Sequence, residues 1–141
     1  MKILIAILLI VHGLIVASQS AGSFGAGTPI PNAAWLQWWP MGLGQSWVLS
    51  TLGLEASPLR ALGSIVWLAG GLALVAAGMV LLGVGFISIG WQTAALVGSI
   101  LSLAMFLIYL HPLMAVGIGA SLAVLYIAVW ADTTMLARWG L

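Results

Sequence analysis

The chain has 141 residues, 64% of them hydrophobic, but only three basic and two acidic side chains, for a formal net charge of +1. A soluble domain of this size needs roughly a quarter of its residues charged, so most of this exterior has to face hydrocarbon. The low charge excludes a basic nucleic-acid-binding surface, and the absence of cysteine excludes disulfides, thiolate metal sites and iron–sulfur clusters. This composition predicts an all-α integral membrane protein with a single transmembrane domain, residues 1–141.

The first apolar stretch covers residues 3–18 and is rather short for a helix that crosses a bilayer, which takes about 20 residues. Lys2 precedes it and small residues follow it, a pattern that is also typical of a secretory signal peptide. We interpret the stretch as a retained first membrane helix.

The segment 19–60 connects the first and second spans and is predicted to be a tryptophan-rich loop at the membrane interface. Its first part is rich in Gly, Ser and Pro, which favours irregular structure. Its second part has no charge and holds four of the eight tryptophans, which prefer the headgroup level. We expect two short interfacial helices, Ala33–Trp39 and Gly44–Leu52, lying on the membrane surface; a re-entrant hairpin is the alternative.

Three further spans follow at 61–82, 90–110 and 112–131. The last two cannot be one helix, because a helix from 94 to 131 would be about 57 Å long at 1.5 Å per residue. His111-Pro112 is therefore predicted to form a tight hairpin, since the residue before proline avoids the helical conformation. After the last span, Asp132 is placed to cap a short helix, Thr133–Trp139.

The four spans make a predicted four-helix bundle with both termini on one side. Lys2 and Arg138 fall on that side and Arg60 on the other, which favours cytoplasmic termini in a bacterial inner membrane. Small residues at helical spacing predict the faces along which the helices pack. These are Gly63, Gly70 and Ala77, with Ala69 and Ala73, in the second span; Gln92, Ala95, Ser99 and Ser102 in the third; and Gly117, Ser121 and Ala128 in the fourth.

Two histidines are the candidate functional side chains. His12 lies within the first span and His111 in the outer hairpin, so both belong to the outer half of the bundle, beside Trp67 and Tyr109. A neutral imidazole can ligate haem iron or chlorophyll magnesium and can donate a hydrogen bond to a quinone. These four residues are therefore candidates for binding a lipophilic cofactor: a quinone, a haem or a chlorophyll-type pigment. The alternative is that each histidine only satisfies local hydrogen-bond partners.

Several chemistries are excluded by what the chain lacks. No span holds a pair of carboxylates, which argues against ion-coupled transport. No P-loop, zinc-ligand spacing or Ser/His/Asp set occurs. We therefore expect no catalytic residues and no metal site, and the chain is not predicted to be an enzyme.

The motifs His12-Gly13-Leu14-Ile15 and His111-Pro112, together with the tryptophan-rich loop, resemble those of small, uncharacterised bacterial four-span membrane proteins. In topology the chain also looks like the DoxX-like four-helix proteins, some of which accompany quinol-oxidising systems. That resemblance implies a four-helix membrane fold and a place beside an electron-transport system.

Two hypotheses about function follow. The first is a non-catalytic accessory or packing subunit of a larger bacterial membrane complex, such as an electron-transport or photosynthetic complex, with the lipid bilayer and other membrane subunits as partners. The second is a protein that binds a lipophilic cofactor near the outer leaflet. A transporter or channel ranks last, because the spans offer few polar groups.

Overall fold

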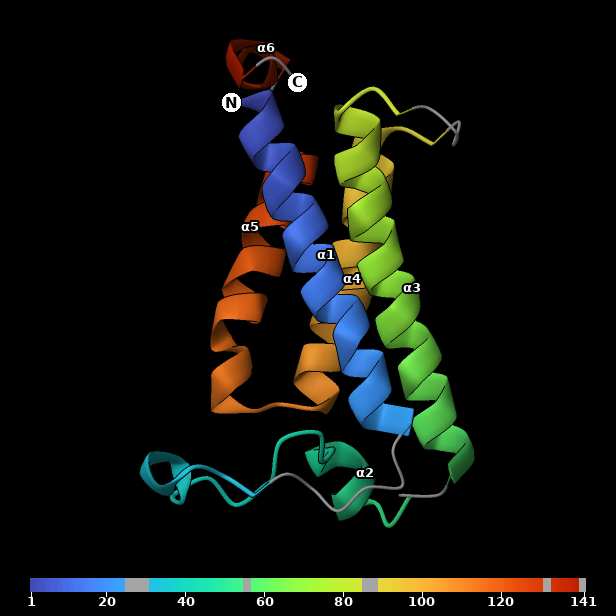
Figure 1. Ribbon diagram of the computed structural model, residues 1–141, viewed down its shortest axis with the longest axis vertical. Helices are drawn as coiled ribbons and strands as arrows, with labels where there is room; N and C mark the ends of the chain where they lie inside the picture. Colours follow the sequence, from blue (N-terminus) through green and yellow to red (C-terminus); the bar gives the residue numbers. More distant parts are fainter. Residues whose placement is uncertain (25–30, 55–56, 85–88, 131–132, 140–141) are drawn as a thin grey trace.

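The computed structural model describes residues 1–24, 31–54, 57–84, 89–130 and 133–139. Every regular element in these ranges is helical, in agreement with the predicted all-α class (Figure 1). In chain order the elements are α1 (Lys2–Phe24), η1 (Ala34–Leu36), α2 (Trp47–Thr51), α3 (Ser57–Leu81), α4 (Trp91–Ile108), η2 (Pro112–Met114), α5 (Ala115–Trp130) and α6 (Thr133–Trp139).

Four of these helices are long and apolar enough to cross a membrane, as the sequence predicts. The qualifying stretches are Lys2–Ala21, Pro58–Leu81, Trp91–Ile108 and Pro112–Trp130. The first helix runs six residues past its predicted end at Ser18. Ser18 Oγ and Gln19 Nε2 both donate to the carbonyl of Ile15, at 2.7 and 3.4 Å, so these polar side chains find partners within the helix and do not require it to end there.

The turns that end the helices follow from local chemistry. Gly83 takes φ +85° after α3, and the amides of Gly83 and Val84 bond back to the carbonyls of Val80 and Met79. This pair of hydrogen bonds around a left-handed glycine is the Schellman motif, which satisfies the last carbonyls of a helix. His111 is extended (φ −146°, ψ 141°), and Pro112 follows at the start of η2, so the predicted hairpin between α4 and α5 is confirmed.

Glycines allow α1 and α3 to touch backbone to backbone. A Cβ on Gly71 would lie 2.5 Å from the carbonyl oxygen of Gly13, and one on Gly78 would lie 2.7 Å from that of Ala6. On the neighbouring face of α3, a Cβ on Gly70 would lie 3.2 Å from Ser102 Oγ of α4. Helix α3 is therefore the central helix, with one small-residue face for α1 and another for α4.

The predicted packing faces are confirmed in part. In α3, Gly63, Gly70 and Ala77 are buried as expected, whereas Ala69 is exposed and belongs to the outer surface. In α4 the buried set lacks Gln92, which is exposed near the start of the helix. The prediction missed Gly71 and Gly78, which form the seam with α1.

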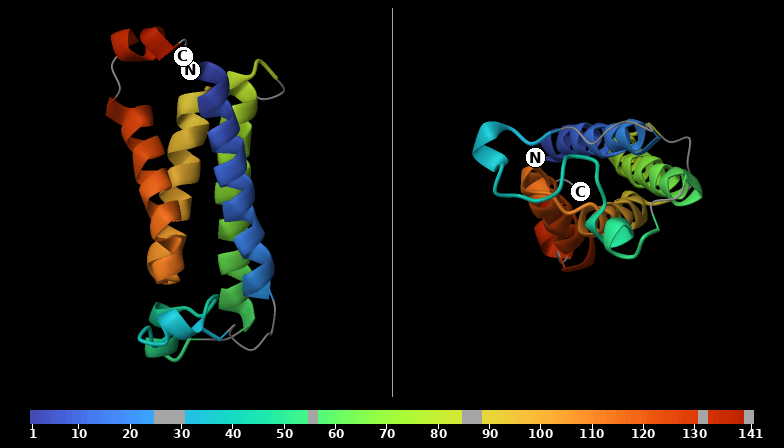
Figure 2. Two further views of the ribbon diagram at one scale, coloured as in Figure 1. Left: turned by 60° about the vertical axis from the view of Figure 1, so that its left-hand side comes forward. Right: turned by 90° about the horizontal axis from the view of Figure 1, so that it is seen from below.

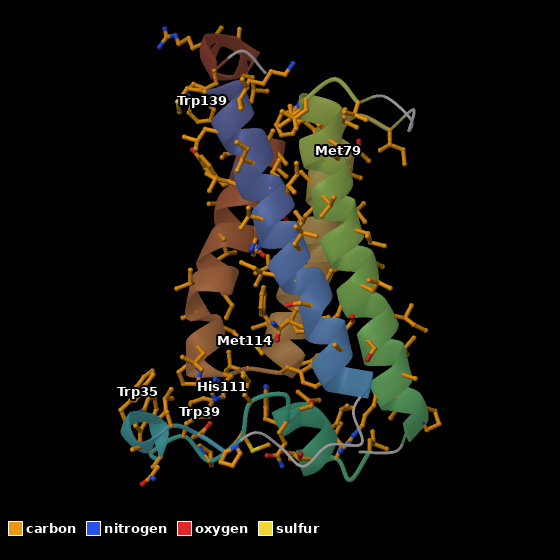
Figure 3. All side chains as sticks on the ribbon, in the orientation of Figure 1. Trp35, Trp39, Met79, His111, Met114 and Trp139 are labelled. Atoms are coloured by element: carbon orange, nitrogen blue, oxygen red, sulfur yellow. The ribbon has the colours of Figure 1, made fainter. Side chains whose placement is uncertain are left out.

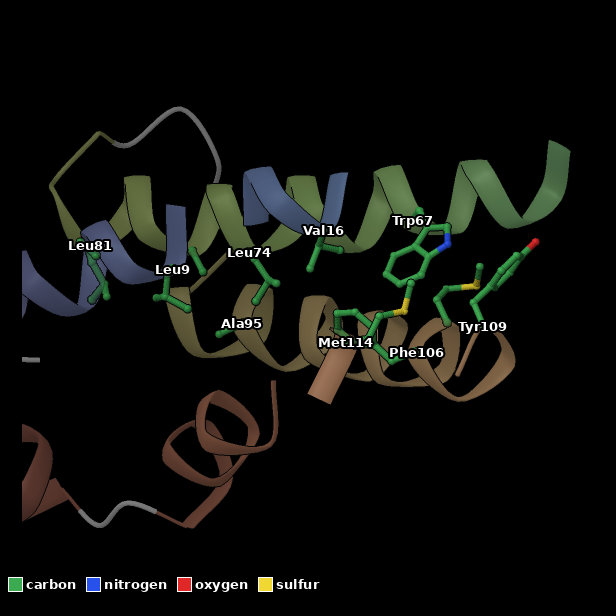
Figure 4. Close-up of a cluster of buried hydrophobic side chains, with 12 residues drawn as sticks. Leu9, Val16, Trp67, Leu74, Leu81, Ala95, Phe106, Tyr109 and Met114 are labelled. Atoms are coloured by element: carbon green, nitrogen blue, oxygen red, sulfur yellow. The ribbon is translucent and has the colours of Figure 1, made fainter. Parts of the chain in front are cut away.

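An aromatic cluster fills the bundle between α3 and α4 (Figure 4). The Trp67 ring is 1% exposed and meets Phe106 edge-on, with ring centroids 5.0 Å apart; Tyr109 lies beside it at 6.3 Å. Met114 of η2 belongs to the same buried cluster. The Trp67 ring therefore points into the bundle and is almost completely covered by its neighbours.

Residues 31–54, which we call the strap, lie across one end of the bundle, outside the helix ends and not between them (Figures 1 and 2). Both chain termini and α6 lie at the opposite end. The strap helices η1 and α2 are shorter than the predicted Ala33–Trp39 and Gly44–Leu52. The amide of Asn32 binds the carbonyls of Trp39 and Met41 and holds this stretch in a closed loop. Helix α6 matches its predicted bounds, while its expected cap, Asp132, lies outside the described residues.

Candidate functional site

The strap is fastened to the bundle at the end of α4. Helix ends leave their last carbonyls without partners within the helix. Here the strap supplies those partners: Ser46 Oγ donates to the carbonyl of Ile108 at 2.9 Å, and Trp47 Nε1 donates to that of Leu107 at 2.6 Å. Ser46 Oγ also accepts the amide of Leu49 and so caps α2. One serine therefore starts the strap helix and ties it to the bundle.

His111 makes the second fastening, with both ring nitrogens engaged. Its Nδ1 accepts the backbone amide of Leu113 at 3.3 Å, and its Nε2 lies 3.0 Å from Asn32 Oδ1. Asn32 then donates through Nδ2 to the carbonyls of Trp39, at 2.8 Å, and Met41, at 2.9 Å. The chain of hydrogen bonds runs from the α4–α5 hairpin into the strap, and Figure 3 shows His111 and Trp39 close together at this end of the bundle.

These contacts set the tautomer of His111. A nitrogen that accepts an amide N–H carries no proton, so Nδ1 is bare and the proton sits on Nε2, from which it is donated to Asn32. The side chain is 2% exposed, and burial lowers the pKa of His111 from its ordinary 6.5, because desolvation penalises the imidazolium. His111 is therefore a neutral hydrogen-bonding residue at neutral pH.

Trp39 packs against this histidine from the strap side. The two ring centroids lie 6.5 Å apart, with the planes at 80°, an edge-to-face contact. The indole Nε1 of Trp39 is buried and has no hydrogen-bond partner, whereas that of Trp47 is bonded. Within the described part of the strap, a network of hydrogen bonds thus lies beside the unsatisfied buried N–H of Trp39.

His12 belongs to a different layer of the bundle. Its Nε2 lies 2.9 Å from Ser121 Oγ of α5, a polar contact between the first and last of the long helices. Ser121 is fully buried and follows His111 by ten residues, which is about 15 Å along a helix. The two histidines therefore lie in separate networks and at separate depths.

We expect the His12–Ser121 pair to contribute measurably to stability. Such bonds between membrane helices are worth about 0.6 kcal/mol on average and up to about 1.7 kcal/mol. A double-mutant cycle with His12→Ala and Ser121→Ala, measured by denaturant unfolding in mixed micelles, should give a coupling energy in this range. A coupling of zero would show that the two side chains do not interact.

The structure brings together only part of the predicted site. Trp67 and Tyr109 lie side by side in the aromatic cluster, His111 lies two residues beyond Tyr109 under the strap, and His12 is apart from all three. Binding of a quinone, a haem or a chlorophyll-type pigment by these four residues stays a prediction. Both nitrogens of His111 already have partners, so ligation of a metal centre there would have to replace one of these bonds.

Sequence reasoning missed Asn32, the residue on which the strap network converges. Its only signal was an amide side chain directly after Pro31, and the same loop also holds the amides Gln37 and Gln45, so nothing in the sequence singled out Asn32. It also gave no warning that Ser64 and Ser99, both fully buried, have hydroxyls without partners. Among the described residues, no group of three or more His, Cys, Asp or Glu could hold a metal ion.

The comparisons with known proteins add no relative. The chain matches no family model, no curated protein and no solved structure. Its function therefore has to be argued from its own residues.

Proposed function

We propose that this chain is an integral membrane protein that serves as a non-catalytic packing subunit of a larger bacterial membrane complex. Two observations support this role: the four long apolar helices, and one side of the bundle that is suited to close helix contact and is not covered by any other helix in the described residues. The resemblance to small four-span and DoxX-like proteins agrees with it.

The bilayer is the surrounding medium that suits this surface. Large apolar side chains point outward all around the bundle, including Leu8 of α1, Ile65 of α3, Ile100 of α4 and Leu122 of α5, each more than half exposed. Exposure of these side chains to water would cost a large free energy, whereas contact with lipid chains would not. Lys2 and Arg138 lie at the end with the termini and Arg60 at the strap end, which favours cytoplasmic termini.

The observation that carries the packing role is the outer face of α5. This helix packs mainly along α4 and is the least buried of the four long helices (Figure 2). Its exposed face presents Ala115, Gly119 and Ala123, spaced four residues apart, and a Cβ on Gly119 would meet nothing within 4 Å. Small residues at this spacing let two membrane helices approach closely. The same device already joins α1 to α3 at Gly71 and Gly78, where a partner helix is present.

Cross-linking in native membranes tests the proposal. Because the chain has no cysteine of its own, an introduced cysteine is the one position of this chain that a thiol-directed cross-linker labels. We expect Ala123→Cys, labelled with a maleimide photo-cross-linker, to form an adduct with another membrane protein. Adding Gly119→Leu should reduce that adduct at least about tenfold, because the larger side chain prevents close approach.

The matched control is Ala69→Cys, an equally small and exposed position on α3. We expect it to label lipid without a protein adduct. An adduct of equal yield at both positions, or no protein adduct at Ala123→Cys, would rule out α5 as the docking face.

A further inference from the structure

We propose that the strap is held by a proton-sensitive latch centred on His111: it is closed over the end of the bundle while the imidazole is neutral and loosens when the imidazole takes up a proton. This regulation is independent of the packing role proposed for α5, which concerns another face. The inference rests on the bonds that His111 makes on each side of its ring.

Protonation conflicts with the geometry at one specific atom. A second proton on the ring has to go to Nδ1, since Nε2 already carries one and donates it to Asn32. Nδ1 faces the amide of Leu113 at 3.3 Å, so protonation would turn an acceptor into a donor opposite another donor. The ring would have to move, and the amide at the start of η2 would lose its cap.

Movement of the ring would be transmitted to the strap through Asn32. The carboxamide accepts from His111 and donates to the carbonyls of Trp39 and Met41, so it ties the two ends of this loop of the strap to the hairpin. The Trp39 ring also rests edge-on against the imidazole. Movement of the protonated ring away from the amide of Leu113 would therefore weaken both the hydrogen bond to Asn32 and the contact with Trp39 on this side of the strap.

The side chains around His111 leave it as the group that titrates there near neutral pH. Asn32 and Trp39 on the strap and Leu113 and Met114 on η2 have no ionisable group, and the phenol of Tyr109, at the end of α4, ordinarily titrates near pH 10. At the same end of the bundle, α3 carries the guanidinium of Arg60. Glu55 lies outside the described residues, and glutamates ordinarily titrate near pH 4.3.

The lowered pKa of His111 determines in which direction pH changes the stability of the closed strap. Burial lowers the pKa of His111 in the closed strap below the 6.5 of an exposed imidazole. The neutral ring therefore stabilises the closed strap fully above about pH 6.5, and this stabilisation is lost as the pH falls through the lowered value. The strap should be closed at pH 7.5 and loosened in mild acid.

Hydrogen exchange of the full chain in lipid nanodiscs, read by mass spectrometry and corrected for the intrinsic pH dependence, tests the latch. We expect protection factors for amides in residues 31–54 to fall at least about tenfold between pH 7.5 and 5.0, while those in the middle of α3 stay constant. His111→Gln and, as a second variant, His111→Asn should show no such step. Asparagine is included because it is a good capping residue that does not titrate.

The chain contains only two histidines, so His12→Gln is the matched control. It should retain the full pH step of the strap, because His12 bonds Ser121 in another layer. Strap protection that is the same at both pH values in the wild type would overturn the proposal. So would a step that persists in both His111 variants or disappears with His12→Gln.

Discussion

Gly71→Leu is expected to be the most disruptive single substitution in the bundle. A Cβ at this position would lie 2.5 Å from both the amide nitrogen of Ala17 and the carbonyl oxygen of Gly13, and these are backbone atoms that no rotamer change can move. Helices α1 and α3 would have to separate along their whole contact. Overpacking in a tight interior costs about 1–3 kcal/mol and occasionally more, and with backbone as the obstacle we expect about 3 kcal/mol or more. Denaturant unfolding in mixed micelles, followed by circular dichroism, measures it.

Gly119→Leu is the matched control, because it makes the same chemical change in a long helix at a position where an added Cβ meets nothing within 4 Å. The free energy of unfolding should stay constant or rise by up to about 1 kcal/mol, since leucine favours a helix more than glycine does. Equal stability of the Gly71→Leu and Gly119→Leu variants would show that α1 and α3 are not in backbone contact. We expect the isolated Gly119→Leu chain to remain folded. A reduced yield of the cross-linked adduct in this variant would therefore show the loss of contact with a partner and not unfolding of the chain.

Trp67→Ala should have the second-largest effect. The indole is the largest of the fully buried side chains and sits among Phe106, Tyr109 and Met114 (Figure 4). Removing it would leave a void between α3 and α4 that the neighbouring rings can fill only in part. Truncation of a buried tryptophan costs about 3–5 kcal/mol, and we expect about 3 kcal/mol. The same unfolding measurement applies.

Trp130→Ala tests whether burial is the cause. This tryptophan is 68% exposed at the end of α5 and contacts Tyr126, one turn earlier, with ring centroids 6.0 Å apart. Such a pair on a helix surface contributes about 0.2–0.5 kcal/mol, so the variant should lose no more than that. A loss at Trp67 as small as the loss at Trp130 would mean that the aromatic cluster does not hold α3 and α4 together.

The coarse architecture could be predicted because it depends on local properties of the chain. Length and apolarity alone indicate the four long helices, and Pro112 alone requires the hairpin between α4 and α5. Helix ends were less accurate. The polar residues Ser18 and Gln19 indicate the start of a loop in the sequence. In the structure their side chains donate to the carbonyl of Ile15 and both residues lie within α1.

The candidate site was predicted less well, because its residues meet across long stretches of sequence. His111 and Asn32 are 79 positions apart, and His12 and Ser121 are 109 apart. No periodicity indicates such pairs. Both histidines were expected in the outer half of the bundle, but the sequence named no partner for either; the structure pairs His12 with Ser121 and His111 with Asn32.

What the sequence by itself determined is the layout: four apolar helices that are long enough to cross a membrane, in a chain with very few charges. Composition and hydrophobic length are sums over residues, so they need no knowledge of contacts. Only the tertiary structure decided which small-residue face of α3 meets which helix, that Trp67 points inward, and that a neutral His111 holds the strap. Each of these depends on how helices are rotated against one another, and in a uniformly apolar chain the pattern of hydrophobic residues does not specify that rotation.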